Sequence, residues 1–182
     1  MPGWVWALIV IGAVVLVALI AWSAYKARKR KRLQERFGPE YDRAVADAPS
    51  KREAESELSE REKRRQELRI KPLARESHDR YASRWHNTQA QFVDDPEQAV
   101  GEADRLIQEV MRERGYPVED FDQRASDLSV DHPEVITNYR AAHDISRAND
   151  RGKASTEDLR TAMVHYRALF DELLEQPERA QA

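Results

Sequence analysis

Residues 4–32, WVWALIVIGAVVLVALIAWSAYKARKRKR, decide the fold expected for this chain. Every residue from 4 to 22 is apolar, and tryptophans stand near both ends of this run. About 20 apolar residues of helix span the roughly 30 Å core of a bilayer, and tryptophan and tyrosine favour its two interfaces. The sequence therefore predicts a transmembrane helix over residues 4–25, with residues 1–3 as a short outside N-terminus. A cleaved signal peptide is the alternative, disfavoured because residues 1–3 carry no basic side chain.

A basic segment, residues 26–32, follows the apolar run. Six of its seven residues are basic: Lys26, Arg28, Lys29, Arg30, Lys31 and Arg32. Basic flanks remain on the cytoplasmic side of a membrane, so we expect a single-pass protein with a cytoplasmic C-terminal domain. The same side chains are expected to contact the anionic headgroups of the lipid bilayer, at about 1 kcal/mol per charge. The alternative is a flank that only sets the orientation of the helix.

The rest of the chain is acidic and contains no cysteine. The 182 residues include 30 Lys and Arg against 33 Asp and Glu, and removing the six basic residues of 26–32 leaves 24 against 33. A domain of this charge is not expected to bind nucleic acid, and a charged protein partner should be basic. Without cysteine, disulfides and cysteine-ligated metals are excluded for this chain.

Residues 33–71 predict a charged helical stalk. Gly38-Pro39 and Ala48-Pro49 interrupt the helical pattern. Between residues 51 and 69 most side chains are charged, and the few apolar ones, such as Leu58, make only a thin stripe. We therefore expect this segment to be solvated and to add nothing to a core. A short coiled coil is the alternative, with too few apolar positions to be preferred.

Residues 72–176 predict a small antiparallel helical bundle of about four main helices and one short helix, so the fold class is all-α. Apolar residues recur at helical spacing over 73–92, 99–111, 135–145 and 159–174, and no run alternates as a strand would. Asp95-Pro96 opens one helix, and Gly115 closes it in a left-handed cap. Short connections favour antiparallel neighbours. Residues 177–182 are expected to be a disordered tail.

Catalytic and metal motifs are missing from the sequence. The five histidines form no tight ligand pair, and there is neither a glycine-rich phosphate loop nor a nucleophile elbow. We therefore expect no catalytic residue, no cofactor and no metal. The alternative is a metal-binding or hydrolytic helical domain whose histidines and acids meet only in the fold, with His78 and His86 as its first candidates.

Residues 114–133, RGYPVEDFDQRASDLSVDHP, combine aromatic and acidic side chains in a turn-rich connection. Such segments suit recognition, and the candidate partner surface consists of Tyr116, Asp120, Phe121, Asp122 and Asp127. Alternatively the aromatic residues only pin a linker to the bundle while the acids cap helices. In Asp131-His132-Pro133-Glu134 the aspartate is expected to cap the next helix.

Four stretches resemble an uncharacterised family of bacterial single-pass membrane-anchored proteins. They are LQERFGPEYDRAV (33–45), QAQFVDDPEQAVGEAD (89–104), RGYPVEDFDQRASDLSVDHPEV (114–135) and TEDLRTAMVHYRALFDELL (156–174). The resemblance implies a bacterial origin and a place in the bacterial cell membrane. It implies no activity and no site residue.

Together these features favour a membrane-tethered cytoplasmic adaptor or scaffold that catalyses nothing and binds an unknown protein, which is expected to be basic if it is charged. One alternative stays open besides the metal-binding or hydrolytic domain already named: a self-associating structural envelope or stress protein. The separate domain 72–176 is expected to fold alone as a monomer.

Overall fold

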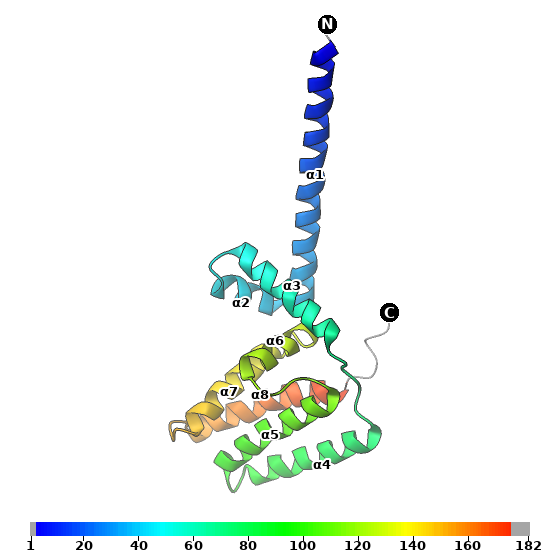
Figure 1. The fold of residues 1–182 in the computed structure, drawn as a ribbon. Coiled ribbons are helices and arrows are strands. Elements are labelled where there is room, and N and C mark those ends of the chain that lie inside the picture. The colour runs from blue at the N-terminus through cyan, green and yellow to red at the C-terminus, as the bar shows by residue number, and fades with distance from the viewer. Residues whose placement is uncertain (1–2, 176–182) are drawn as a thin grey trace.

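The computed structural model describes residues 3–175 (Figure 1), and describes the side chains of all of these except residues 3, 5–10 and 13. This part of the chain is all-α, as predicted, with no strand among the described residues. The helices are α1 Gly3–Phe37, α2 Pro39–Asp47, α3 Lys51–Glu67, α4 Arg75–Gln91, α5 Pro96–Arg114, α6 Phe121–Asp131, α7 Ile136–Asn149 and α8 Thr156–Glu175. The predicted disordered tail, residues 177–182, lies outside the described residues.

The structure corrects the prediction of a transmembrane helix. In the described part of the chain, no helix is long and apolar enough to cross a membrane. The single-pass topology, the outside N-terminus and the cytoplasmic domain of a bacterial cell-membrane protein were predicted from that helix. They are corrected with it.

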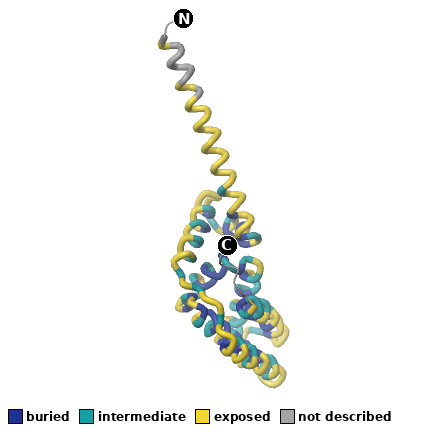
Figure 2. Tube along the Cα trace, turned by 90° about the vertical axis from the view of Figure 1, so that its right-hand side faces the viewer, coloured by how far each residue is buried: buried dark blue, intermediate teal, exposed yellow. Residues whose placement is uncertain are grey.

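A small hydrophobic core joins the lower end of α1 to α2 and α3, so the prediction of a solvated stalk is wrong. It contains Leu33, Phe37, Tyr41, Ala44, Ala54 and Leu58, together with Val130 of α6. Gly38, at φ 46°, turns the chain between α1 and α2, and Pro39 starts α2. Each helix alone offers few apolar residues, but three helices folded against one another pool them into a buried cluster (Figure 2). We call α2, α3 and the end of α1 from Leu33 the N-terminal module.

The larger core lies between α4, α5, α6, α7 and α8, which form the bundle. The face predicted for α5 is buried along its whole length, from Ala99 to Met111. Trp85 of α4 stacks on Phe170 of α8 with ring centroids 4.5 Å apart. Asp95 caps α5 by accepting a hydrogen bond from the Gln98 backbone N–H. Successive helices α4 and α5 lie side by side (Figure 1), and the bundle matches the four main helices and one shorter helix that were expected.

Gly115 ends α5 in the left-handed conformation, at φ 99°, as the sequence predicts. A Cβ at this position would also lie 2.6 Å from the carbonyl oxygen of Arg69, which is closer than side chains tolerate. The connection after α3 therefore passes directly against the end of α5, and the backbone N–H of Lys71 donates to the carbonyl of Arg114 at 2.9 Å. The bundle and the N-terminal module are thus joined by tight backbone packing as well as by the chain itself.

Candidate functional site: an arginine–carboxylate interface

Carboxylates of α6 face arginines from the N-terminal module. Asp127 is fully buried, and its Oδ1 accepts hydrogen bonds from Arg64 Nε of α3 and from Gln123 Nε2, both at 3.0 Å. Burial raises the pKa of Asp127, while Arg64 and Gln123 act in the opposite direction. Asp127, which was predicted to bind an external basic partner, is therefore paired with Arg64 of the same chain.

Asp131, at the end of α6, collects side chains from three other segments. Arg65 of α3 donates to its Oδ2, Tyr116 donates to the same oxygen at 2.7 Å, and Arg36 of α1 lies 3.7 Å from Oδ1. Burial, with help from Asp131, raises the pKa of Tyr116 far above its usual range, so the phenol stays a donor. The expectation that Asp131 caps the next helix is wrong: α7 begins after Val135 without a side-chain cap.

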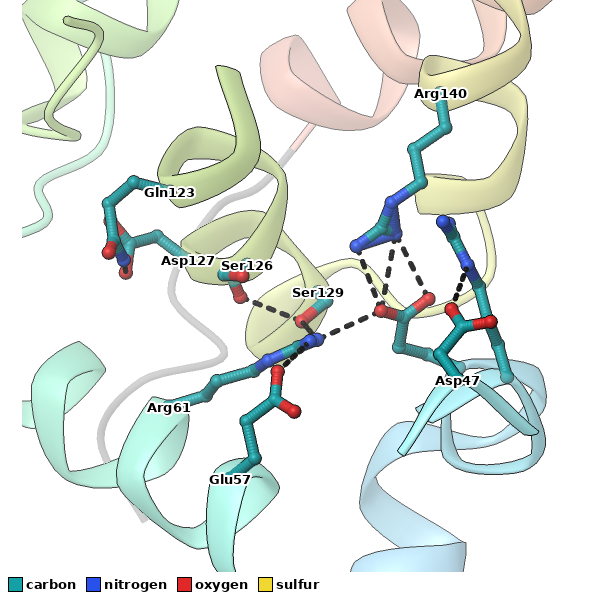
Figure 3. A network of polar contacts seen from close by, with 10 residues as sticks. Asp47, Glu57, Arg61, Gln123, Ser126, Asp127, Ser129 and Arg140 are labelled. Atoms are coloured by element: carbon teal, nitrogen blue, oxygen red, sulfur yellow. Dashed lines mark hydrogen bonds and ion pairs between the residues drawn. The ribbon is translucent and has the colours of Figure 1, made fainter. Parts of the chain in front are cut away.

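Glu40 of α2 is the most enclosed carboxylate of the N-terminal module, with 1% of its surface exposed. Arg140 of α7 donates to both of its oxygens at 2.9–3.2 Å, and Arg61 of α3 donates to Oε1 at 2.9 Å. Arg61 also reaches Ser129 of α6 at 3.2 Å and Glu57 at 2.6 Å (Figure 3). Burial lowers the pKa of Arg140 and Glu40 opposes that shift. One network thus ties α2, α3, α6 and α7 together.

Two open cavities border this network, and Arg61 contributes to the lining of both. The first, of about 420 Å³, is lined by Glu40 and Arg140 together with charged residues of α2 and α3. The second, of about 430 Å³, lies between α3 and the start of α6 near Gln123. The linings of both cavities contain carboxylates as well as basic side chains, as expected beside helices that are joined by ion pairs.

The structure separates the five residues predicted as a partner surface. Tyr116 and Asp127 are buried, so the expectation of exposure fails for them. Phe121 is half-buried and stacks on His143 at 3.6 Å between ring centroids. Asp120 caps α6 by accepting from the Gln123 backbone N–H at 2.8 Å. Asp120 and Asp122 remain exposed, at the first turn of α6.

The basic residues expected at lipid headgroups also divide into groups. Arg32 pairs with Glu62 of α3 at 2.6 Å, and Lys31 pairs with Glu35 at 3.6 Å. The ammonium of Lys26 lies 5.3 Å from the ring centroid of Trp22. Arg28 and Arg30 are exposed, and Lys29 is partly covered. Contact with lipid stays a prediction for this set.

The histidines do not gather at one point. His78 Nδ1 lies 3.0 Å from Asp79 Oδ1, and His86 is exposed further along α4. In residues 3–175 as described, no group of three or more histidine, cysteine or acidic side chains is placed to hold one metal ion.

Sequence reasoning missed Glu40 and Arg140, the centre of the network. They lie 100 residues apart, and a glutamate in the first turn of a helix normally indicates a solvated charge near the helix dipole. The available signal was weak: Glu40 follows Gly38-Pro39 next to Tyr41, in a segment whose apolar residues had no assigned core.

Comparison with known protein families, with curated proteins and with solved structures finds no match to this chain.

Buried histidines give the fold a predictable response to acid. Burial lowers the pKa of His132, opposed by Asp131 and Glu172, and also lowers the pKa of His143, opposed by Asp104. In the unfolded chain histidine protonates near pH 6.5. Below that pH the folded state binds fewer protons than the unfolded chain. The contribution of the two histidines to the free energy of unfolding is therefore fully present above about pH 6.5 and is lost as the pH falls below it.

We therefore expect the urea midpoint of the full chain to fall between pH 7.5 and pH 5.5. The double variant His132→Gln, His143→Gln should show a smaller fall, because neither side chain can then take up a proton. His86→Gln, at an exposed position of α4, is the matched control. An unchanged pH dependence in the double variant would contradict this assignment.

Proposed function

We propose that the protein is a non-enzymatic helical adaptor or scaffold that binds a basic segment of a protein partner at the first turn of α6. The observation that carries the proposal is the use α6 already makes of its carboxylates. Asp127 and Asp131 bind arginines of α1 and α3, while Asp120 and Asp122 of the same helix are exposed. Helix α6 thus binds arginines of its own chain through two carboxylates and leaves two further carboxylates exposed to solvent.

The character of the contact between the N-terminal module and α6 supports this proposal. Val130 is the one α6 residue of the smaller core among those described, while Ser129, Asp127 and Asp131 of α6 make hydrogen bonds and ion pairs with arginines of α3. Interfaces of this polar type resemble those between separate proteins that associate reversibly. Arginine side chains of a partner can be received by the same chemistry.

The experiment compares two charge variants of the full chain by proximity labelling from the C-terminus in the native host. The test variant is Asp120→Asn with Asp122→Lys, in which asparagine keeps the cap of α6. The control is Asp94→Asn with Glu97→Lys, which makes the same charge change on exposed residues at the start of α5.

We expect the test variant to lose labelled partners that the control retains, because carboxylates at a rim steer association with a basic surface. The melting temperatures of the two variants should agree within a few degrees. Identical labelling by both variants would show that the first turn of α6 is not the partner surface.

A further inference from the structure

A third cavity, of about 590 Å³, lies between α1 and the beginning of α3, away from the α6 surface. The ring of Trp22 and the methyl group of Ala27 contribute from α1, and Ser50 lies at the start of α3. Four cations complete the lining: Lys26 and Arg30 of α1, and Lys51 and Arg52 of α3. The cavity therefore joins an apolar aromatic surface to a concentrated positive charge.

These four cations differ from the arginines of the neighbouring turns. Arg32 and Arg36 pair with Glu62 and Asp131. By contrast, none of the four pairs with a carboxylate in the part of the chain that is described. Aromatic rings hold two of them instead: Lys26 lies over Trp22 at 5.3 Å, and Lys51 lies over Tyr41 at 5.8 Å. Like charges repel one another when brought together without a counter-charge.

Glu55 is the single carboxylate in the lining, and its one negative charge cannot balance the four positive charges. Its Oε1 accepts a hydrogen bond from the hydroxyl of Tyr41 at 3.0 Å. Four positive charges against one engaged carboxylate leave the cavity with a net positive charge.

We propose that this cavity binds a phosphate group carrying an apolar or glyceryl substituent. Guanidinium groups bind phosphate oxygens through paired N–H donors, and lysine ammonium groups bind them as point charges. The ring of Trp22 provides the surface for the substituent. A phospholipid headgroup and a soluble phosphate ester both have this chemistry. The proposal is independent of the partner surface on α6.

The test titrates the full-length protein with two probes. One is glycerol 3-phosphate; the other is phosphatidylcholine vesicles with and without phosphatidylglycerol. Trp22 reports on binding, as the part of the fluorescence change that disappears in Trp22→Phe. The test variant is Lys51→Glu with Arg52→Glu, where acidic residues in the first turn of α3 favour the helix. The control, Arg151→Glu with Lys153→Glu, makes the same charge change on exposed residues between α7 and α8, outside the cavity lining.

We expect the test variant to weaken binding about tenfold or more and the control about threefold or less, since charges in direct contact count far more than distant ones. Binding of glycerol 3-phosphate identifies a soluble ester as a sufficient ligand. Binding only to vesicles that contain phosphatidylglycerol identifies the headgroup of a phospholipid. Equal weakening in both variants, or no Trp22 signal with either probe, overturns the proposal.

Discussion

Replacing Glu40 with alanine should lower the free energy of unfolding by about 3–5 kcal/mol, the usual cost of removing one partner of a buried ion pair. Glu40 is enclosed, and the two arginines that it holds are also largely covered: the side chain of Arg61 is 13% exposed and that of Arg140 is 15% exposed. Without the carboxylate, two guanidinium groups would lie close together in a poorly solvated space. Urea unfolding followed by circular dichroism measures the change.

Glu57→Ala is the matched control for this variant. Glu57 also pairs with Arg61, at 2.6 Å, but its side chain is 54% exposed. A solvent-exposed pair of this kind contributes about 0.2–1 kcal/mol. A Glu40→Ala variant no less stable than Glu57→Ala would mean that Arg61 and Arg140 find other partners and that the network does not hold the N-terminal module in place.

Leu58→Ala should cost about 2–5 kcal/mol, as much as Leu106→Ala in the centre of the bundle. Both side chains are fully buried, Leu58 in the smaller core and Leu106 in the larger one. If residues 33–71 were a solvated stalk, as the sequence predicts, Leu58→Ala would instead cost well under about 1 kcal/mol. Thermal and urea unfolding of the full chain distinguish the two values.

Val164→Ala on α8 is the control, because Val164 is 63% exposed and surface substitutions usually stay within about 0.5 kcal/mol. If Leu58→Ala behaves like Val164→Ala, the stalk interpretation is restored. If it behaves like Leu106→Ala, the N-terminal module contributes to the folded core and residues 72–176 are not the whole of the structural unit.

The bundle could be predicted from sequence because its signals are local and repeated. The apolar face of α5, the cap at Asp95 and the left-handed Gly115 each follow from residues a few positions apart. The faces of α4 and α7 follow in the same way from their helical spacing. In such segments periodicity identifies the buried face without knowledge of the neighbour.

The N-terminal module could not be predicted, because no single helix in it has a sufficient apolar face. Leu33 and Phe37, Tyr41 and Ala44, and Ala54 and Leu58 form a core only when three helices meet. Since the charged side chains between them outnumber the apolar ones, the sequence resembles that of a solvated stalk. Tertiary packing reverses this interpretation.

The ion pairs of the site could not be predicted for a different reason. Arg64 and Asp127 are 63 residues apart, and Arg140 and Glu40 are 100 apart. In a chain that is 35% charged, many opposite pairs are available to each arginine, and sequence spacing does not rank them. The same ambiguity led to Asp131 being interpreted as a helix cap when its carboxylate is engaged by Arg65 and Tyr116.

The continuity of α1 has a mechanical consequence. Its 35 residues form one rod of about 50 Å, and among the side chains of α1 that the structure describes, Leu33 and Phe37 are the ones buried in a core. A force applied near Gly3 would therefore act with a long lever arm on Leu33 and Phe37 and on Arg36 between them. Because the helix is continuous, the direction in which each side chain of α1 points about the helix axis is fixed relative to Leu33 and Phe37. Adding a single residue between Tyr25 and Leu33 would turn the whole free end by about 100° relative to the bundle, whereas adding seven would nearly restore the original direction.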